Sequence, residues 1–178
     1  MQFDKEKFKA LVHYIIWKAG ASPGFGSTKL NKVLWFSDAK LFALTGKPIT
    51  GAKYIREKYG PVPALALPMQ AELEAEGLIK VSKEKYFSKS ITHFRALHAP
   101  RSNVFSEKEL QTINYWIDHI SNEHTATSIS DESHDYAWEI AKEGEELPLY
   151  AFWANRTHPS DGKDLEWAKS EAKRLGLS

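Results

Sequence analysis

Three residue types of a hydrolase triad stand side by side at Ser133, His134 and Asp135, within the stretch SISDESHDYAWEIAKEG (residues 128–144). A catalytic serine, histidine and aspartate act through hydrogen bonds in which each side chain reaches the next. Neighbouring side chains point about 100° apart on a helix and to opposite faces on a strand. These three residues therefore cannot form the relay together, and the stretch predicts no catalytic residues. A hydrolase that pairs His134 with distant partners stays an alternative.

The same stretch has the pattern of a helix start. Ser128 and Asp131, and Ser130 and Ser133, have the spacing of N-terminal caps, which predicts a helix over residues 131–142. His134, Ala137, Trp138 and Ala141 then fall on one apolar face. We expect His134 to point inward against Trp138 and to serve packing.

Histidines elsewhere are the remaining candidate metal ligands, because the chain has no cysteine. Zinc ligands on a helix lie three or four residues apart on one face. The pairs His93/His98 and His119/His124 are five apart, which turns the rings about 140° from each other on a helix and to opposite faces on a strand. The sequence predicts no metal site.

A glycine-rich loop, GASPGFGSTKLNK (residues 20–32), invites comparison with a phosphate-binding loop. The phosphate loop needs G-x-x-x-x-G-K-[ST] after a strand. Here the order after Gly26 is Ser, Thr, Lys, and the preceding residues have helical spacing. We therefore expect a capped turn between two helices and no cofactor.

These residues are positioned by elements that are mostly helical. Apolar spacing predicts helices over residues 4–19, capped by Asp4, and 28–45, capped by Ser27 or Thr28. A short strand or helical turn follows near residues 49–55, and Pro61 is expected to start a third helix that ends at Gly77. Pro68 implies that this helix starts late or bends.

Residues 78–97 read as a β-hairpin. Ser106 and Glu109 form a capping box that opens the next helix, with Phe105 and Leu110 as its hydrophobic staple. A last helix is expected over residues 161–176. The fold class is mainly α: a compact multi-helix domain with one small β-hairpin and a possible winged-helix-like core.

Bulk composition fits one cytoplasmic domain. The 178 residues are 42% hydrophobic and 26% charged, with a net charge of +1. No signal peptide and no apolar run of the length of a membrane helix are present. The near-zero charge gives no general attraction to nucleic acid.

DNA binding through a winged helix is the main alternative. The hairpin carries several cations, but the helix before it holds Glu72, Glu74 and Glu76 and no Lys or Arg. A recognition helix of that charge is repelled by the phosphates of a groove. Nucleic acid is therefore not the expected partner.

The segments Lys29–Asp38, Gly46–Gly51, Tyr59–Pro63 and Gly77–Ile79, with a later Ser-His followed by Trp138, resemble the SocA-like Panacea domain, or phage GepA-like family. Trp35 and Pro68 depart from its usual pattern. The resemblance covers roughly residues 5–155, and residues 1–155 are taken as the domain with residues 156–178 as its helical extension. The motif residues, expected to be mostly structural, are Lys29, Asn31, Lys32, Phe36, Asp38, Gly51, Tyr59, Gly60, Pro61, Val62, Ser133, His134 and Trp138.

The resemblance implies a non-enzymatic antitoxin-type domain. Such a protein neutralises a cognate toxin by direct protein contact, and some members also deliver the toxin to a Clp-type protease. A contact surface of this kind uses aromatic anchors with charged rims. The candidate partner contacts are Tyr54, Tyr59, Tyr115, Trp116 and Trp153.

Overall fold

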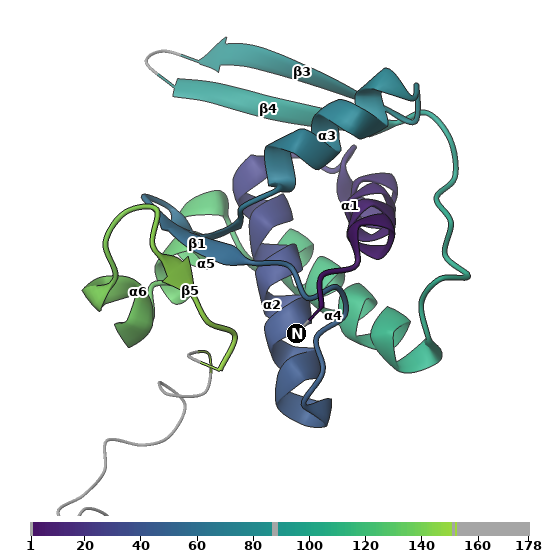
Figure 1. Ribbon diagram of the computed structural model, residues 1–178. Coiled ribbons are helices and arrows are strands. Elements are labelled where there is room, and N and C mark those ends of the chain that lie inside the picture. Colours follow the sequence, from purple (N-terminus) through teal and green to yellow (C-terminus); the bar gives the residue numbers. More distant parts are fainter. Residues whose placement is uncertain (1, 87–88, 151, 153–178) are drawn as a thin grey trace, which may run out of the picture.

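The computed structural model describes residues 2–86, 89–150 and 152. Within them the chain is mainly α-helical, as predicted, with two small antiparallel sheets (Figure 1). The elements, in chain order, are α1 (Lys5–Ala19), α2 (Ser27–Thr45), β1 (Tyr54–Glu57), β2 (Gly60–Pro63), α3 (Ala66–Ala75), β3 (Ile79–Tyr86), β4 (Lys89–Ala96), α4 (Glu107–Glu123), α5 (Ala126–Glu132), α6 (Tyr136–Ile140) and β5 (Glu146–Leu147).

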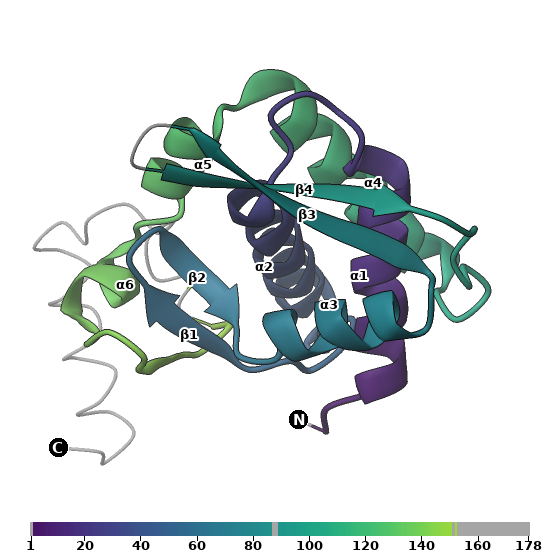
Figure 2. The same cartoon turned by 90° about the horizontal axis from the view of Figure 1, so that it is seen from above.

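Helix α2 runs through the middle of the domain, with α1, α4 and the two sheets around it (Figure 2). Its residues are buried on nearly all sides, which is typical of a central helix that is apolar nearly all round. The Asp4 side chain caps α1 as expected, accepting from the Lys7 backbone N–H at 2.9 Å. The expected caps Ser27 and Thr28 are wrong, because α2 already begins at Ser27 after an extended Gly26.

A three-stranded sheet replaces the single short strand or helical turn expected near residue 55. Its order is β2-β1-β5, and β1 and β2 pair across a two-residue turn, with Glu57 opposite Gly60. The prediction that Pro61 starts a helix is wrong, because Pro61 lies within β2 opposite Arg56. This sheet is an addition to the one hairpin that the sequence indicated.

Helix α3 begins at Ala66, so Pro68 stands in its first turn, where a backbone N–H has no helical partner to lose. The predicted late start is confirmed. The β3–β4 hairpin follows directly, with Ile79 paired to Ala96 and Val81 to Phe94. Helices α1, α2 and α3 thus precede this hairpin as in a winged helix, with β1 and β2 inserted between α2 and α3.

The capping box of α4 is confirmed: the Ser106 Oγ accepts from the Glu109 N–H, and Glu109 accepts from the Ser106 N–H at 2.8 Å. The single helix expected over residues 131–142 is wrong. Helix α5 is capped by Thr125 and ends at Glu132, and α6 starts afresh because Asp135 caps the Trp138 N–H. The helix expected at 161–176, and with it the extension 156–178, lies outside the described residues.

The core joins all these elements. Phe8, Leu11 and Ile15 of α1 are completely buried, and they pack in one cluster with apolar side chains of α2, α3, α4 and both sheets. No helix in the described part of the chain has the length and apolar character to cross a membrane.

Candidate functional site

Motif residues that lie far apart in the sequence meet around the buried amine of Lys32. Lys32 extends from α2 with 1% of its surface exposed, and its Nζ donates to the Pro61 carbonyl oxygen at 2.9 Å. Gly60 has φ +91°, and a Cβ there would overlap the Ser133 Oγ and lie 2.6 Å from the Lys32 Nζ. Only glycine therefore lets α2, β2 and the end of α5 approach so closely.

Burial controls the charge of this cluster. Desolvation lowers the pKa of the Lys32 amine to about 7, so the amine loses its proton near neutral pH. Desolvation also lowers the pKa of His134, and the nearby positive charges of Lys32 and Arg56 act in the same direction. His134 is therefore neutral at pH 7.

A stack of side chains covers the cluster on its outer side. The His134 and Trp138 rings are parallel, with centroids 3.6 Å apart, so the predicted contact is confirmed. Both residues are half-buried, and Trp138 packs against the hydrophobic core, so the pair lies at the edge of the core. The Trp138 Nε1 donates to the Glu57 carbonyl oxygen at 2.9 Å, and the Arg56 guanidinium lies 4.3 Å from the indole centroid. These contacts hold α6 against β1.

Each member of the Ser-His-Asp trio contacts a residue outside the trio. The Ser133 Oγ donates to the Ser130 carbonyl oxygen at 2.7 Å, and the His134 Nε2 lies 3.4 Å from the Ser130 Oγ. The Asp135 carboxylate accepts from the Trp138 N–H. Ser133 is also 2% exposed, so its hydroxyl is closed to a substrate. The arrangement is that of a helix junction.

Ser22 lies in a segment that matches the sequence motif of a nucleophile elbow. Gly20-Ala21-Ser22-Pro23-Gly24 matches G-x-S-x-G. The elbow places its serine between a strand and a helix. Here the motif follows α1 and forms the turn that leads to α2. Its context is therefore that of an interhelical turn.

Asp38 holds the motif segment Gly46–Gly51 in place through hydrogen bonds. Its fully buried carboxylate accepts from the backbone N–H groups of Ile49 and Thr50 at 2.8 and 3.0 Å, from the Thr50 hydroxyl at 2.7 Å and from the Tyr54 hydroxyl at 2.9 Å. Burial raises the pKa of Asp38, and these hydrogen bonds oppose the rise. Gly51, with φ +69°, allows the following turn to pass against the backbone of Gln2. The motif thus ties the loop after α2 to that helix.

Two further motif residues, Lys29 and Phe36, also hold elements together. The Lys29 Nζ donates to the Ser121 carbonyl oxygen of α4 at 3.4 Å, and the Phe36 ring stacks on Trp116 at 4.6 Å. Asn31 and Val62 are half-buried on α2 and β2.

Two of the five candidate partner contacts are corrected by their burial. Tyr54 is 1% exposed and Trp116 is 4% exposed, so neither presents its ring to a partner. Tyr59 and Tyr115 are more than half exposed. Trp153 lies outside the described residues.

Exposed apolar side chains stand on two segments that adjoin the motif cluster. Tyr59 stands in the β1–β2 turn, and Tyr136 and Ile140 lie on α6, each more than half exposed. The Trp138–Glu57 hydrogen bond joins the two segments. The Lys58 ammonium lies 5.4 Å from the Tyr59 ring centroid. We call Tyr59, Tyr136 and Ile140, with Lys58 beside them, the turn–α6 surface.

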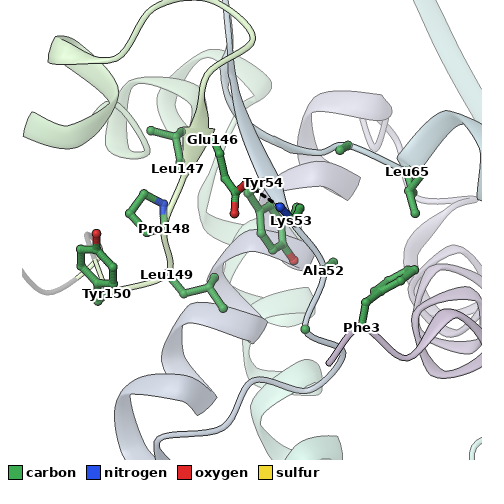
Figure 3. Close-up of a pocket in the computed structure, with 12 residues that line it drawn as sticks. Phe3, Ala52, Lys53, Tyr54, Leu65, Glu146, Leu147, Pro148, Leu149 and Tyr150 are labelled. Atoms are coloured by element: carbon green, nitrogen blue, oxygen red, sulfur yellow. Dashed lines mark hydrogen bonds and ion pairs between the residues drawn. The ribbon is translucent and has the colours of Figure 1, made fainter. Parts of the chain in front are cut away.

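A separate pocket of about 720 Å³ lies at the other end of the three-stranded sheet (Figure 3). Its walls are mainly apolar and come from residues 51–54 and 146–150, with Phe3 and Leu65 facing them. An ion pair of 2.8 Å between Lys53 and Glu146 stands at its rim. The motif residues Lys32, Ser133 and His134 are not among those that line it.

The prediction that the rings of His119 and His124 point away from each other is wrong. Helix α4 ends at Glu123, so His124 is not on the helix that carries His119, and the two rings lie 4.9 Å apart. Glu132 of α5 lies beside them. Thr125 and Ser128, spaced as a capping box, are the sequence signal that would have ended the helix before residue 125.

Comparison with known proteins gives one family. The model of the family described as "Antitoxin SocA-like, Panacea domain" matches residues 30–139, which is more than half of the chain. Neither the curated proteins nor the solved structures contain a significant match. The matched span includes Lys32, Asp38, Gly60, Ser133, His134 and Trp138. By this match, and with the motif residues gathered as described, the chain belongs to the SocA-like antitoxin family defined by the Panacea domain.

Proposed function

We propose that this protein is a cytoplasmic antitoxin that neutralises a cognate protein toxin by direct contact, without catalysis. The observation that carries the proposal is its membership of the SocA-like antitoxin family. The partner of such a protein is another protein, and we assign neither a cofactor nor a catalytic residue.

The turn–α6 surface is the face that we assign to the toxin. Aromatic side chains with two rotatable bonds supply large contact area at low entropic cost, and charged residues at the rim add specificity. Tyr59 and Tyr136 are such anchors, and Lys58 provides a charge. The segments below them are held by the Lys32–Pro61 and Trp138–Glu57 hydrogen bonds, so the surface is formed before binding. Tyr115 on α4 is the alternative contact.

Growth rescue tests the proposal. The product of the neighbouring gene is expressed alone and together with this chain, and we expect toxicity alone, rescue by co-expression and co-purification of the two proteins. Tyr59→Ala should reduce affinity by about tenfold or more, the effect of removing a central aromatic anchor. The matched control is Leu67→Ala, which removes an exposed apolar side chain of α3. A harmless, non-binding neighbour would sink the proposal.

Delivery of the toxin to a Clp-type protease is a second, finer proposal. It rests on the same family membership. In a purified system, the toxin should be degraded faster when this chain is present at equal concentration. If the toxin is bound but is degraded at an unchanged rate, the adaptor proposal is wrong, while neutralisation by direct contact still stands.

A DNA-binding autoregulator is the alternative function, favoured by the charge of the β3–β4 hairpin. Lys80, Lys83, Lys85 and Arg95 are exposed on it. Against it, α3 contains no Lys or Arg that could contact phosphate groups in a groove. Glu72 of α3 and Glu76, which follows its last residue, form ion pairs with Lys5 and Lys9 of α1. We therefore favour the protein partner.

A further inference from the structure

A cluster at the junction of α4 and α5 has the composition of a metal site. His119, His124 and Glu132 each offer one ligand atom, and these three atoms lie within 4.8 Å of one another. The cluster is separate from the Lys32 cluster, and neither the family motifs nor the proposed toxin contact accounts for it.

The chain path brings the three residues together. His124 follows the last residue of α4 in an extended conformation, with φ −124° and ψ 145°, which turns its ring back over the last turn of α4. Thr125 then caps α5 through its box with Ser128. Glu132 lies in the last turn of α5, with 38% of its side chain exposed, while the two histidine side chains are 22% and 15% exposed.

Two of the three separations between ligand atoms match tetrahedral coordination, and the third is within 4.8 Å. The His119 Nε2 and His124 Nε2 atoms are 3.3 Å apart, and the His124 Nε2 and the Glu132 Oε2 are 3.4 Å apart. Ligands bound to Zn²⁺ at about 2.0–2.1 Å with tetrahedral angles are separated by about 3.3–3.4 Å. Both histidines turn the same atom, Nε2, toward the common point.

Second hydrogen bonds orient both rings. The His119 Nδ1 lies 3.0 Å from the Glu123 carboxylate, which can only accept, so this nitrogen carries the proton. The His124 Nδ1 lies 3.2 Å from the Ser128 Oγ, whose own proton is directed to the Thr125 carbonyl oxygen. With both protons on Nδ1, two Nε2 lone pairs face each other across 3.3 Å, and either a shared proton or a metal ion between them satisfies both. Metal-binding histidines are held by outer partners of this kind.

We propose that His119, His124 and Glu132 bind one divalent transition-metal ion of the Zn²⁺ class through Nε2, Nε2 and a carboxylate oxygen. Two imidazoles and a carboxylate suit Zn²⁺ better than Mg²⁺ or Ca²⁺, which prefer oxygen ligands. Three protein ligands leave one position, on the Glu132 side, for water. The ion links α4 to α5, whose end carries Ser133.

Metal titration of the full chain tests the site. Protein without a polyhistidine tag is stripped with a chelator, and Zn²⁺ binding is measured by calorimetry, with Co²⁺ absorption reporting the coordination geometry. We expect one saturable equivalent and the strong visible absorption of tetrahedral Co²⁺. His124→Gln and Glu132→Gln should each weaken binding by about tenfold or more, and Glu123→Gln should weaken it less.

The matched control is His93→Gln. His93 also lies beside a carboxylate, with its Nε2 3.1 Å from Glu84, but on the exposed hairpin and outside the three-residue cluster. This variant should bind Zn²⁺ as the unchanged chain does. Circular dichroism verifies that each variant is folded, and Zn²⁺ should raise the Tm of the unchanged chain but not of His124→Gln. Absence of saturable binding, or equal binding by His124→Gln and His93→Gln, would overturn the site.

Discussion

Lys32 places its amine in the interior of the protein, where the amine stabilises packing through a hydrogen bond but is unfavourable in its charged form. Its hydrogen bond to Pro61 fixes β2 to α2, but desolvation of the ammonium lowers its pKa from 10.5 to about 7. A lysine at this position of a helix is ordinarily assigned to solvent from sequence alone. Its family motif singled it out, whereas its titration near neutral pH follows only from the packing around it.

Replacing Lys32 by Met tests this titration. Between pH 7 and 10.5 the unfolded chain binds more protons at residue 32 than the folded chain, so this lysine makes the free energy of unfolding rise with pH. We compare the free energy of unfolding of the unchanged chain with that of Lys32→Met. From pH 7 to 9, the value for the unchanged chain should rise relative to that of the variant by up to about 1.4 kcal/mol per pH unit. Urea denaturation at pH 6, 7, 8 and 9 measures it. Parallel profiles would show that the amine titrates normally.

Two features of the structure disfavour any side chain at position 60: its left-handed backbone conformation and the close contacts around it. Gly60→Ala forces a Cβ against Ser133 and Lys32, whereas Gly77→Ala, at φ +70°, places its Cβ in open space. Both variants pay the left-handed strain of about 1–2 kcal/mol. We expect Gly60→Ala to lose at least about 1–2 kcal/mol more than Gly77→Ala, the range for overpacking, in chemical denaturation. Equal losses would mean that the junction relaxes around the new methyl group.

At the scale of elements, caps decide where the last helices begin and end. The capping box at Ser106 could be predicted from the sequence because the hydrophobic staple and the apolar spacing of the following residues indicate the same helix start. The region after it offers several competing caps, and Thr125 and Asp135 are the ones used. The Thr125 cap has a local signal in its box with Ser128. The start of α6 after Asp135 is accompanied by the Trp138–Glu57 hydrogen bond, a tertiary contact that local spacing does not contain.

The cap of α4 gives a test at this scale. Ser106→Ala removes the acceptor for the Glu109 N–H, so the chain should lose about 1 kcal/mol of unfolding free energy. Ser106→Thr keeps the hydroxyl and should recover most of this loss. Thermal and urea unfolding of the two variants measure the difference. A Thr variant as unstable as the Ala variant would show that the hydroxyl is not the stabilising group.

At the scale of the whole molecule, charge is balanced within the fold. Glu72 of α3 and Glu76, which follows it, form ion pairs with Lys5 and Lys9 of α1. Lys80, Lys83, Lys85 and Arg95 are exposed on the β3–β4 hairpin. The net charge of the whole chain is +1. This distribution suits recognition of one protein better than of a polyanion.

A gel-shift experiment separates the two partner classes. With DNA of its own promoter at low salt, the unchanged chain should cause no retardation at micromolar concentration, because non-specific binding requires several phosphate contacts. Lys83→Glu on the hairpin should leave this result and toxin binding unchanged. A salt-sensitive shift that Lys83→Glu abolishes would instead support the autoregulator.

The sequence by itself determined the helical class, the hairpin at 78–97, the α4 cap and the family motifs, because these depend on neighbours within a few residues. Tertiary structure alone decided the burial of Tyr54 and Trp116, since an aromatic residue looks the same in sequence whether it covers the core or faces a partner. It also decided the meeting of Lys32, Gly60 and Ser133, and of His119 with His124 and Glu132. Those contacts join separate elements, and they form only when the chain turns where packing dictates.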